Sequence, residues 1–237
     1  MNRFDYVAIH FLNGFAHRSP ALDGFIFKVE ESNLLKGGIA LALFWWAWFD
    51  GTKPDFEKRS LILFAFISSS FALLLGRAVS LLIPFRDRPF QDPLYHFQLP
   101  YTVTGGVHSW NSSPSDHAVL FFCLATCLYM ISRPLGILAM FHAIFVISLP
   151  RIYVGYHFPT DILAGAALGI ATAFLCKLPA LHRKVTYPAF QWMEKHPASF
   201  YAFAFFVTFE VAELFESLME MQSFARHALA GFMRSRF

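Results

Sequence analysis

Long apolar runs, separated by short polar segments, make up most of this chain. A run of about 20 apolar residues is long enough to cross a bilayer as a helix. The pattern therefore predicts an all-α, polytopic transmembrane helix bundle of about six spans, five in the core and one at the C-terminus. The predicted spans cover residues 34–49, 60–85, 114–131, 135–149, 158–178 and 200–221.

Both ends of the chain carry charges among their apolar residues. Residues 4–30 mix Phe, Ile and Leu with acids and bases, which predicts one or two short helices lying in the membrane interface. We expect one membrane domain over residues 1–180, to which residues 181–237 add a C-terminal extension with one further helix. The last span either crosses with an acidic stripe turned inward or lies at the surface. That stripe consists of Glu210, Glu213, Glu216 and Glu220.

The composition supports a membrane protein. The 237 residues are 56% hydrophobic and 15% charged, whereas soluble domains carry about 25% charged residues. The net charge of +3 is too small and too dispersed to indicate nucleic-acid binding. The cysteines all lie in apolar runs and indicate neither a disulfide nor a metal framework. The lipid bilayer is thus the expected partner, and the sequence leaves the oligomeric state open.

One polar stretch stands out at membrane depth, RIYVGYHFPTD, which covers residues 151–161. Charged groups there are costly and are usually functional. Pro159 favours the first turn of a helix, so His157 should lie at the helix start and Asp161 one turn further in. A carboxylate on one ring nitrogen raises the basicity of the other, which makes a histidine a nucleophile or a base. Taken alone, such a pair is as often a structural hydrogen bond.

A second polar cluster, Ser115, Asp116 and His117, begins the third predicted span. Free backbone N–H groups and the helix dipole attract an anion at such a place, although a Ser-Asp pair there is usually only a cap. Two arginines change this interpretation, because Arg88 and Arg151 offer planar forks of donors that suit a phosphate. The three segments together describe a pocket for a tetrahedral oxyanion with a histidine on either side.

The predicted topology places all of these groups on one membrane face. The ends of the second and fourth spans and the starts of the third and fifth lie on the same side. When the arginines beside the motifs, Arg86, Arg88 and Arg151, are set aside, Lys and Arg number eight on the opposite face and seven on this one, and the short loops that weigh most in this rule favour a cytoplasmic opposite face. We therefore expect the site on the extracytoplasmic face.

The three segments resemble the signature of the type-2 phosphatidic acid phosphatase superfamily. That signature has a Lys, six residues and Arg-Pro; then Pro-Ser-Gly-His; then Ser-Arg, five residues, His, three residues and Asp. The resemblance extends over about residues 77–170 and keeps the order of the parts. Here the parts appear as Arg88-Pro89, as Pro114-Ser115-Asp116-His117, and as Arg151, His157 and Asp161.

Three positions depart from the signature. Leu81 stands where the family has Lys, so Arg77, one turn earlier on the same helical face, or Arg86 is expected to replace it as a phosphate ligand. Pro150 stands where the family has Ser, which removes a hydroxyl contact. Asp116 replaces Gly at a position that we include among the phosphate-binding residues, and it brings a carboxylate near the anion site. With the apolar helix that follows it, this variant is similar to undecaprenyl pyrophosphate phosphatases of the bacitracin-resistance type.

The resemblance implies a metal-independent phosphatase of the bacterial inner membrane that needs no cofactor and acts on a lipid phosphate. In this mechanism His157, oriented by Asp161, forms a phosphohistidine while His117 protonates the departing oxygen. A polyprenyl pyrophosphate is the first choice of substrate. The phosphate oxygens would be held by Arg88, Arg151, Ser115 and local backbone amides.

Other functions remain open at this point. The motif residues bind the phosphate group and not the lipid tail, so phosphatidic acid, phosphatidylglycerol phosphate and a lipid A phosphate are alternative substrates. Transfer of the phosphoryl group to another lipid is a second alternative. A non-catalytic transporter or scramblase is a third, although the polar groups cluster at one face and line no route across. Residues 90–113 fit a lid or a headgroup-binding surface, and His142 fits a structural role in the bundle.

Overall fold

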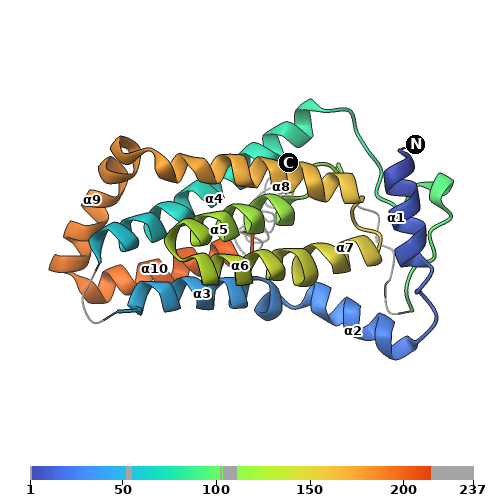
Figure 1. Ribbon diagram of the computed structural model, residues 1–237, viewed down its shortest axis with the longest axis horizontal. Coiled ribbons are helices and arrows are strands. Elements are labelled where there is room, and N and C mark those ends of the chain that lie inside the picture. The colour runs from blue at the N-terminus through green and yellow to red at the C-terminus, as the bar shows by residue number, and fades with distance from the viewer. Residues whose placement is uncertain (1, 52–54, 102, 104–110, 215–237) are drawn as a thin grey trace, which may run out of the picture.

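The computed structural model describes residues 2–51, 55–101, 103 and 111–214, and every regular element within them is a helix (Figure 1). This confirms the all-α prediction. The first half contains α1 Arg3–Asn13, α2 Pro20–Glu31, the π-helix η1 Leu34–Gly38, α3 Ile39–Phe49, α4 Phe56–Leu82 and the short η2 Pro93–Tyr95. The second half contains α5 Asp116–Ile131, α6 Arg133–His142, the π-helix η3 Ala143–Ser148, α7 Leu149–Tyr153, α8 Pro159–Ala173, η4 Phe174–Lys177, α9 Pro179–Lys195 and α10 Pro197–Ala212.

The core is built around α5, which is buried from residue 117 to residue 128. Helices α4, α6 and α8 pack against it. Helix α8 approaches closely because two of its residues lack a side chain. A Cβ atom on Gly165 would lie 2.7 Å from the Ser115 carbonyl oxygen, and one on Gly169 would lie 2.2 Å from the Val119 carbonyl oxygen. This contact brings the polar starts of α5 and α8 together.

Two helical segments are long and apolar enough to cross a membrane, Phe56–Leu82 and Arg133–Tyr153. The second one combines α6, η3 and α7 and continues four residues beyond the predicted end at residue 149. The other apolar helices among the described residues are shorter. A bundle of about six spans therefore stays a prediction.

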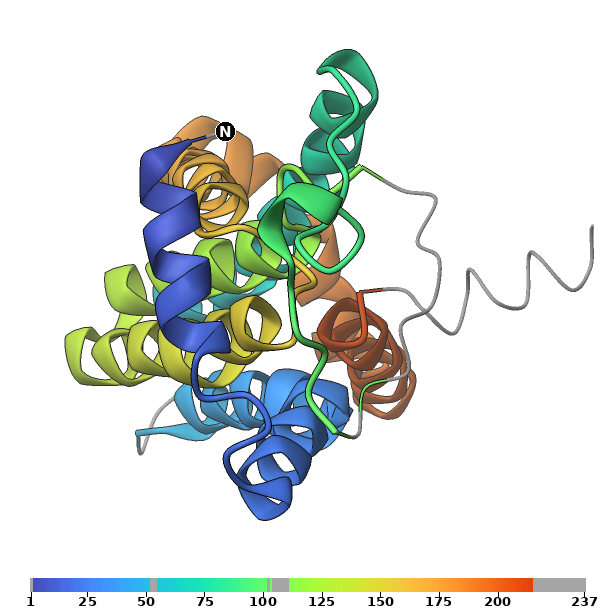
Figure 2. The same ribbon diagram turned by 90° about the vertical axis from the view of Figure 1, so that its right-hand side faces the viewer.

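The N-terminal segment forms two helices, α1 and α2, as the sequence predicts. Asn2 caps α1 through the Phe4 amide, and Ser19 caps α2 through the Leu22 amide. Helix α1 lies across one end of the bundle, while α2 extends in the direction of α3 (Figures 1 and 2). The placement of this segment in a membrane interface stays a prediction.

The predicted last span begins as α10, and its end lies outside the described residues, together with Glu216 and Glu220. The described part of the acidic stripe faces inward. Glu210 is buried, and Glu213 accepts a hydrogen bond of 3.3 Å from the Asn33 side chain. This arrangement favours the first of the two predicted placements for the described acids.

Candidate active site

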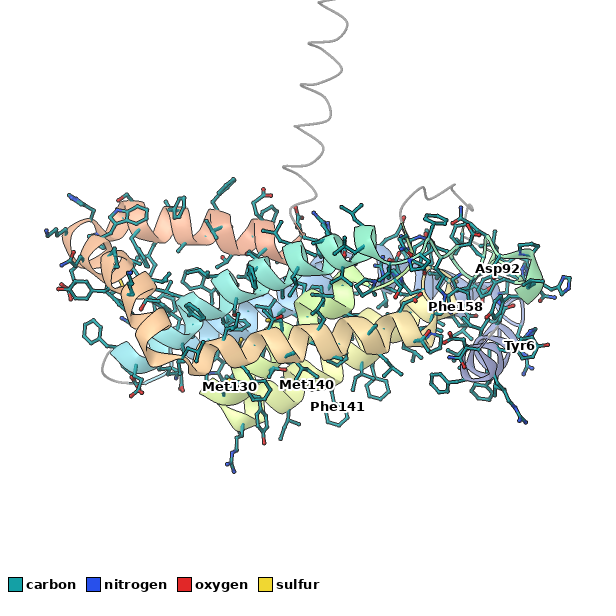
Figure 3. All side chains as sticks on the ribbon, turned by 90° about the horizontal axis from the view of Figure 1, so that it is seen from above. Tyr6, Asp92, Met130, Met140, Phe141 and Phe158 are labelled. Atoms are coloured by element: carbon teal, nitrogen blue, oxygen red, sulfur yellow. The ribbon has the colours of Figure 1, made fainter. Side chains whose placement is uncertain are left out.

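The predicted site residues lie at the end of the bundle that α1 crosses. The loop after α4, the start of α5, the turn between α7 and α8, and the start of α8 all meet there. Figure 3 shows Phe158, which precedes α8, at the same end as Tyr6 of α1 and Asp92 of the loop. The structure thus brings together segments that are up to 155 residues apart in the sequence, since Asp5 contacts Thr160.

His157 lies in the turn between α7 and α8 with 4% of its surface exposed. The turn is possible because Gly155 has a φ of 80°, and the carbonyl oxygen of Arg151 accepts the Tyr156 amide at 2.9 Å. The His157 Nδ1 atom lies 2.8 Å from the carbonyl oxygen of Ser112. A carbonyl only accepts, so Nδ1 carries the proton and Nε2 is the ring nitrogen that has the lone pair.

Asp161 contacts the surroundings of His157 and not its ring, among the residues that the structure describes. One carboxylate oxygen accepts from Arg86 at 2.7 Å, and the other accepts from the Ser112 hydroxyl at 2.6 Å and the Phe158 amide at 2.9 Å. The expected direct hydrogen bond between Asp161 and His157 is therefore replaced by a link through Ser112. The physical reason is that Asp161 folds back onto the free amide at the start of its own helix.

The start of α5 holds two buried polar atoms without a hydrogen-bond partner in the described structure, Ser115 Oγ and His117 Nε2. Ser115 makes no side-chain cap, so the ordinary structural interpretation of this Ser-Asp pair does not hold. Buried polar atoms are normally satisfied, and exceptions call for a ligand, water or a catalytic role. Both atoms lie at a helix N-terminus, where the backbone favours an anion.

Arg88 and Arg151 add positive charge to this end of α5. Arg88 donates to the Tyr156 carbonyl oxygen at 2.9 Å, and Arg151 donates to the buried Glu30 carboxylate at 2.7 Å. The Nε atoms of both arginines are buried and have no partner among the described residues. Burial, followed by the charge of Arg151, lowers the pKa of Arg88 to about 10. A bound anion would relieve this repulsion, as expected of a phosphate pocket.

Arg86 is held by acids rather than presented to the pocket. Its guanidinium donates to Asp5 and to Asp161, each at 2.7 Å, and stacks over the Phe158 ring at 3.8 Å from the centroid. Burial alone would lower the pKa of Arg86, but the two carboxylates outweigh it and raise the pKa. These contacts favour a structural role for Arg86 over the predicted phosphate-binding role, because both ends of its donor fork are taken.

Arg77 and Asp116, two further predicted phosphate-binding residues, form an ion pair of 3.1 Å. Both side chains are about one-third exposed (33% and 34%). The pair explains how a carboxylate is tolerated beside an anion site, since Arg77 neutralises it. Of the two candidates for the missing family lysine, Arg77 is the one whose location beside the start of α5 fits.

We expect Arg77→Ala to lower kcat/KM by roughly tenfold or more, because an unpaired Asp116 carboxylate would repel the anionic substrate. Adding Asp116→Asn to Arg77→Ala should restore part of the loss. Arg133→Ala is the matched control, since Arg133 is exposed at the start of α6. Steady-state kinetics of the four proteins would check this. An Arg77→Ala protein as active as the Arg133→Ala protein would show that the ion pair is structural only.

The structure also reveals polar residues that the sequence analysis did not place at the site. Ser112 is fully buried between Asp161 and His157. Lys36 of η1 is buried, and its charge acts on His117 together with those of Arg151 and Arg88. The sequence contains only a weak signal for such residues. It consists of charges within the apolar N-terminal segment, and interfacial helices explain those charges equally well. Two acids of that segment complete the set, Asp5 and Glu30.

The described part of the predicted lid is attached to the N-terminal helices. Asn13 exchanges two hydrogen bonds with the backbone of Gln98, and Asp23 accepts from the Tyr101 amide at 3.1 Å. Residue 102 and residues 104–110 lie outside the described part, so the lid role stays a prediction. His142 Nε2 donates to the Leu35 carbonyl oxygen at 2.7 Å, which agrees with its predicted structural role.

No group of three or more His, Cys, Asp and Glu side chains within the described ranges is arranged to hold a metal ion. The predicted site residues include two buried histidines, His117 and His157. Within the described part of the chain, one ring nitrogen of His157 lies at a carbonyl, and the buried atoms His117 Nε2, Arg88 Nε, Arg151 Nε and Ser115 Oγ have no hydrogen-bond partner.

Comparison with known proteins identifies the family. The sequence model of the PAP2 superfamily matches residues 60–183. The chain is 24% identical to the bacitracin transport permease protein BcrC of Bacillus licheniformis over 188 residues, which cover 76% of this chain and 84% of that protein. It is 25% identical to the undecaprenyl-diphosphatase BcrC of Bacillus subtilis (strain 168) over 175 residues, which cover 74% and 82%. No solved structure matches.

Proposed function

The chain belongs to the PAP2 superfamily, and from this premise we propose that it is a membrane lipid phosphatase that removes the terminal phosphate of a polyprenyl pyrophosphate. The name of the Bacillus subtilis relative, undecaprenyl-diphosphatase, supports the undecaprenyl lipid as the substrate. We place the enzyme in the bacterial inner membrane with its site on the extracytoplasmic face. This orientation rests on the distribution of Lys and Arg.

The observation that carries the proposal is the pair of buried histidines at one anion pocket. His157 has its Nδ1 atom on the Ser112 carbonyl, and His117 has an Nε2 atom without a described partner. Phosphoryl transfer through a covalent intermediate needs a nucleophile and an acid placed in this way. A transporter or a scramblase has no need for a histidine of fixed tautomer.

In the first step, the lone pair of His157 Nε2 attacks the terminal phosphorus in line with the bridging oxygen. The P–O bond breaks, and His117 gives its proton to the departing polyprenyl phosphate. The three equatorial oxygens gain charge at this moment and are stabilised by Arg88, Arg151 and the amides at the start of α5. The product of this step is a phosphohistidine and a lipid monophosphate.

In the second step, the now neutral His117 takes a proton from a water molecule. The resulting hydroxide attacks the phosphorus, the P–N bond breaks, and inorganic phosphate leaves. His157 recovers its lone pair, and His117 recovers its proton. The residues alone balance protons and charge over the cycle, so the proposed reaction is metal-independent.

The relatives suggest one alternative of a different class. The Bacillus licheniformis relative is named a transport permease, so transport of a lipid or a peptide antibiotic is the rival function. Other rivals share the chemistry but differ in the substrate or in the acceptor. They are phosphatidic acid, phosphatidylglycerol phosphate and lipid A phosphate as substrates, and another lipid as the phosphoryl acceptor.

Phosphate release by the purified protein in detergent, with a chelator present, would test the proposal. Undecaprenyl pyrophosphate, phosphatidic acid and phosphatidylglycerol phosphate are compared at equal surface concentration. We expect the pyrophosphate to be hydrolysed at least about tenfold faster than the glycerolipids. A glycerolipid preference would overturn the substrate, and dependence on added metal would overturn the metal-free mechanism. Consumption of lipid without release of phosphate would indicate transfer to an acceptor.

A further inference from the structure

Helix α1 carries one acid in an unusual environment. Its neighbours Phe4 and Val7 are more than half exposed, whereas Asp5 is completely buried. A buried carboxylate is costly unless its charge and its lone pairs are satisfied. Asp5 meets this condition through contacts with the active-site end of the bundle and with no residue of its own helix.

The contacts of Asp5 form a chain that ends at the proposed nucleophile. Asp5 accepts from the Thr160 amide at 3.0 Å, from the Thr160 hydroxyl at 2.6 Å and from Arg86 at 2.7 Å. Arg86 then donates to Asp161 at 2.7 Å. The chain continues from Asp161 to Ser112, whose carbonyl oxygen meets the His157 ring.

Apolar contacts run beside this chain. Ile9 of α1 and Tyr95 pack with Phe158, the residue that follows His157, in a small separate cluster of buried side chains. The Arg86 guanidinium covers the same Phe158 ring. Helix α1 therefore touches both neighbours of the catalytic turn, the ring beside His157 and the first turn of α8.

We infer that Asp5 is a positioning residue of the active site. By balancing Arg86 between two carboxylates, it keeps Asp161 directed at Ser112 and so fixes the ring of His157. The N-terminal helix is then part of the catalytic apparatus. The kinetic tests of this inference rest on the proposed function, but the position of the His157 ring can be measured without any substrate.

The hydrogen bonds of Arg86 should differ with and without the Asp5 charge. With Asp5 present, Arg86 shares its donors between Asp5, Thr160 and Asp161. Without the Asp5 charge, the guanidinium is drawn toward Asp161 and competes with Ser112 for its oxygens. The hydrogen bond that orients the Ser112 carbonyl then weakens, and His157 loses its fixed tautomer.

The kinetic test compares Asp5→Asn with Asp23→Asn. Asp23 is also a completely buried acid of the N-terminal helices, but it binds Tyr153, Tyr101 and His17 instead of Arg86. We expect Asp5→Asn to lower kcat by about 30-fold or more with KM changed less than threefold, since Asp5 does not touch the substrate. Asp23→Asn should lower kcat by less than threefold. Equal losses in the two proteins would overturn the inference.

A double-mutant comparison tests whether Asp5 acts through Arg86. In the Arg86→Gln background, Asp5→Asn should lower kcat by a further threefold or less, because the link is already broken. Independent, multiplying losses would overturn the inference. If Asp5→Asn yields no folded protein, Thr160→Val takes its place, since it removes the hydroxyl between Asp5 and Arg86 and keeps both charges. It should lower kcat without changing KM, and full activity would count against the inference.

The third measurement needs no turnover. The ¹⁵N chemical shifts of labelled histidine, with His157 assigned by its loss in His157→Gln, report which ring nitrogen carries the proton. The unaltered protein and Asp23→Asn should show His157 protonated at Nδ1, whereas Asp5→Asn should show a mixture of tautomers. An unchanged tautomer in Asp5→Asn would overturn the inference. If the unaltered protein releases no phosphate from any lipid, the proposed function fails, and this spectrum still decides the role of Asp5.

Discussion

His157→Ala protein is expected to release phosphate from undecaprenyl pyrophosphate at least about 10,000-fold more slowly than the unaltered protein, because the covalent route needs a nucleophile at this position. The effect should lie in kcat, since the arginines that bind the phosphate are unchanged. The initial rate of phosphate release in detergent, with a chelator present, measures this.

The matched control is His142→Gln. Like His157, His142 is buried, and one of its ring nitrogens lies at a backbone carbonyl, that of Leu35. It lies in the bundle and has no contact with the anion pocket among its described partners. We expect this variant to be less stable to heat but to keep its turnover. Substantial release by His157→Ala would overturn the assignment of the nucleophile and would reopen transport as the function.

The meeting of the three polar segments was predictable because each of them is a short motif. Each of the three segments carries its polar groups within a few residues, and the predicted alternation of spans puts them on one side. The structure places Ser115, His117 and Asp161 together at the starts of α5 and α8, where a Ser115 amide donates to the Asp161 carbonyl. Motif spacing therefore predicted that these segments meet.

The partners of these residues were less predictable. Helical spacing places Asp161 one turn after His157, but it does not say which donors lie nearest to its oxygens. The helix-start amide of Phe158 is local, whereas Ser112 and Arg86 come from a distant loop. Competition among these donors decides the geometry, and only the folded chain fixes it.

The N-terminal acids illustrate the same limit. Asp5 and Glu30 look like interfacial charges in the sequence, because nothing local distinguishes them from Asp50 or Glu31, which are exposed. Their buried roles depend on Arg86 and Arg151, at separations of 81 and 121 residues. Long-range pairing of charges has no periodic signal, so a single sequence does not reveal it.

The end of the fourth predicted span shows a different limit. Pro150 suggests a helix end, because proline removes a backbone donor and clashes with the carbonyl four residues earlier. The helical segment nevertheless continues to Tyr153, since the π-helix η3 precedes Pro150 and its wider turns relieve that clash. The Ser148 hydroxyl donates to the Ala143 carbonyl within the same stretch. The continued helix is what carries Arg151 to the site.

Replacing His117 is expected to have an effect that depends on the leaving group. His117→Gln removes both the acid of the first step and the base of the second, and each role contributes about 100- to 10,000-fold. A pyrophosphate substrate loses a lipid phosphate, whose second pKa is about 6 and which leaves without much help. Phosphatidic acid loses an alkoxide, which needs the proton. The reaction of the variant should therefore stop at a different step with each substrate.

With undecaprenyl pyrophosphate, His117→Gln should form the phosphohistidine and fail to hydrolyse it, so labelled phosphate accumulates on the protein. With phosphatidic acid, the same variant should stall before the P–O bond breaks, and little label should appear. The measurement is the amount of acid-labile, base-stable ³²P on protein quenched with alkali after a few seconds. The His117→Gln, His157→Ala double variant is the control and should carry no label from either lipid.

The comparison between the two lipids is decisive because His117 has two roles, acid in the first step and base in the second, and the two lipids depend on the first role to different degrees. Equal labelling from both substrates would mean that His117 is not the acid of the first step. Absence of label from both, with release still slowed, would mean that water attacks the substrate directly and that His157 acts only as a base. Strong labelling from the pyrophosphate alone would tie the nitrogen of His117 that has no described partner to proton transfer and the lone pair of His157 to the covalent bond.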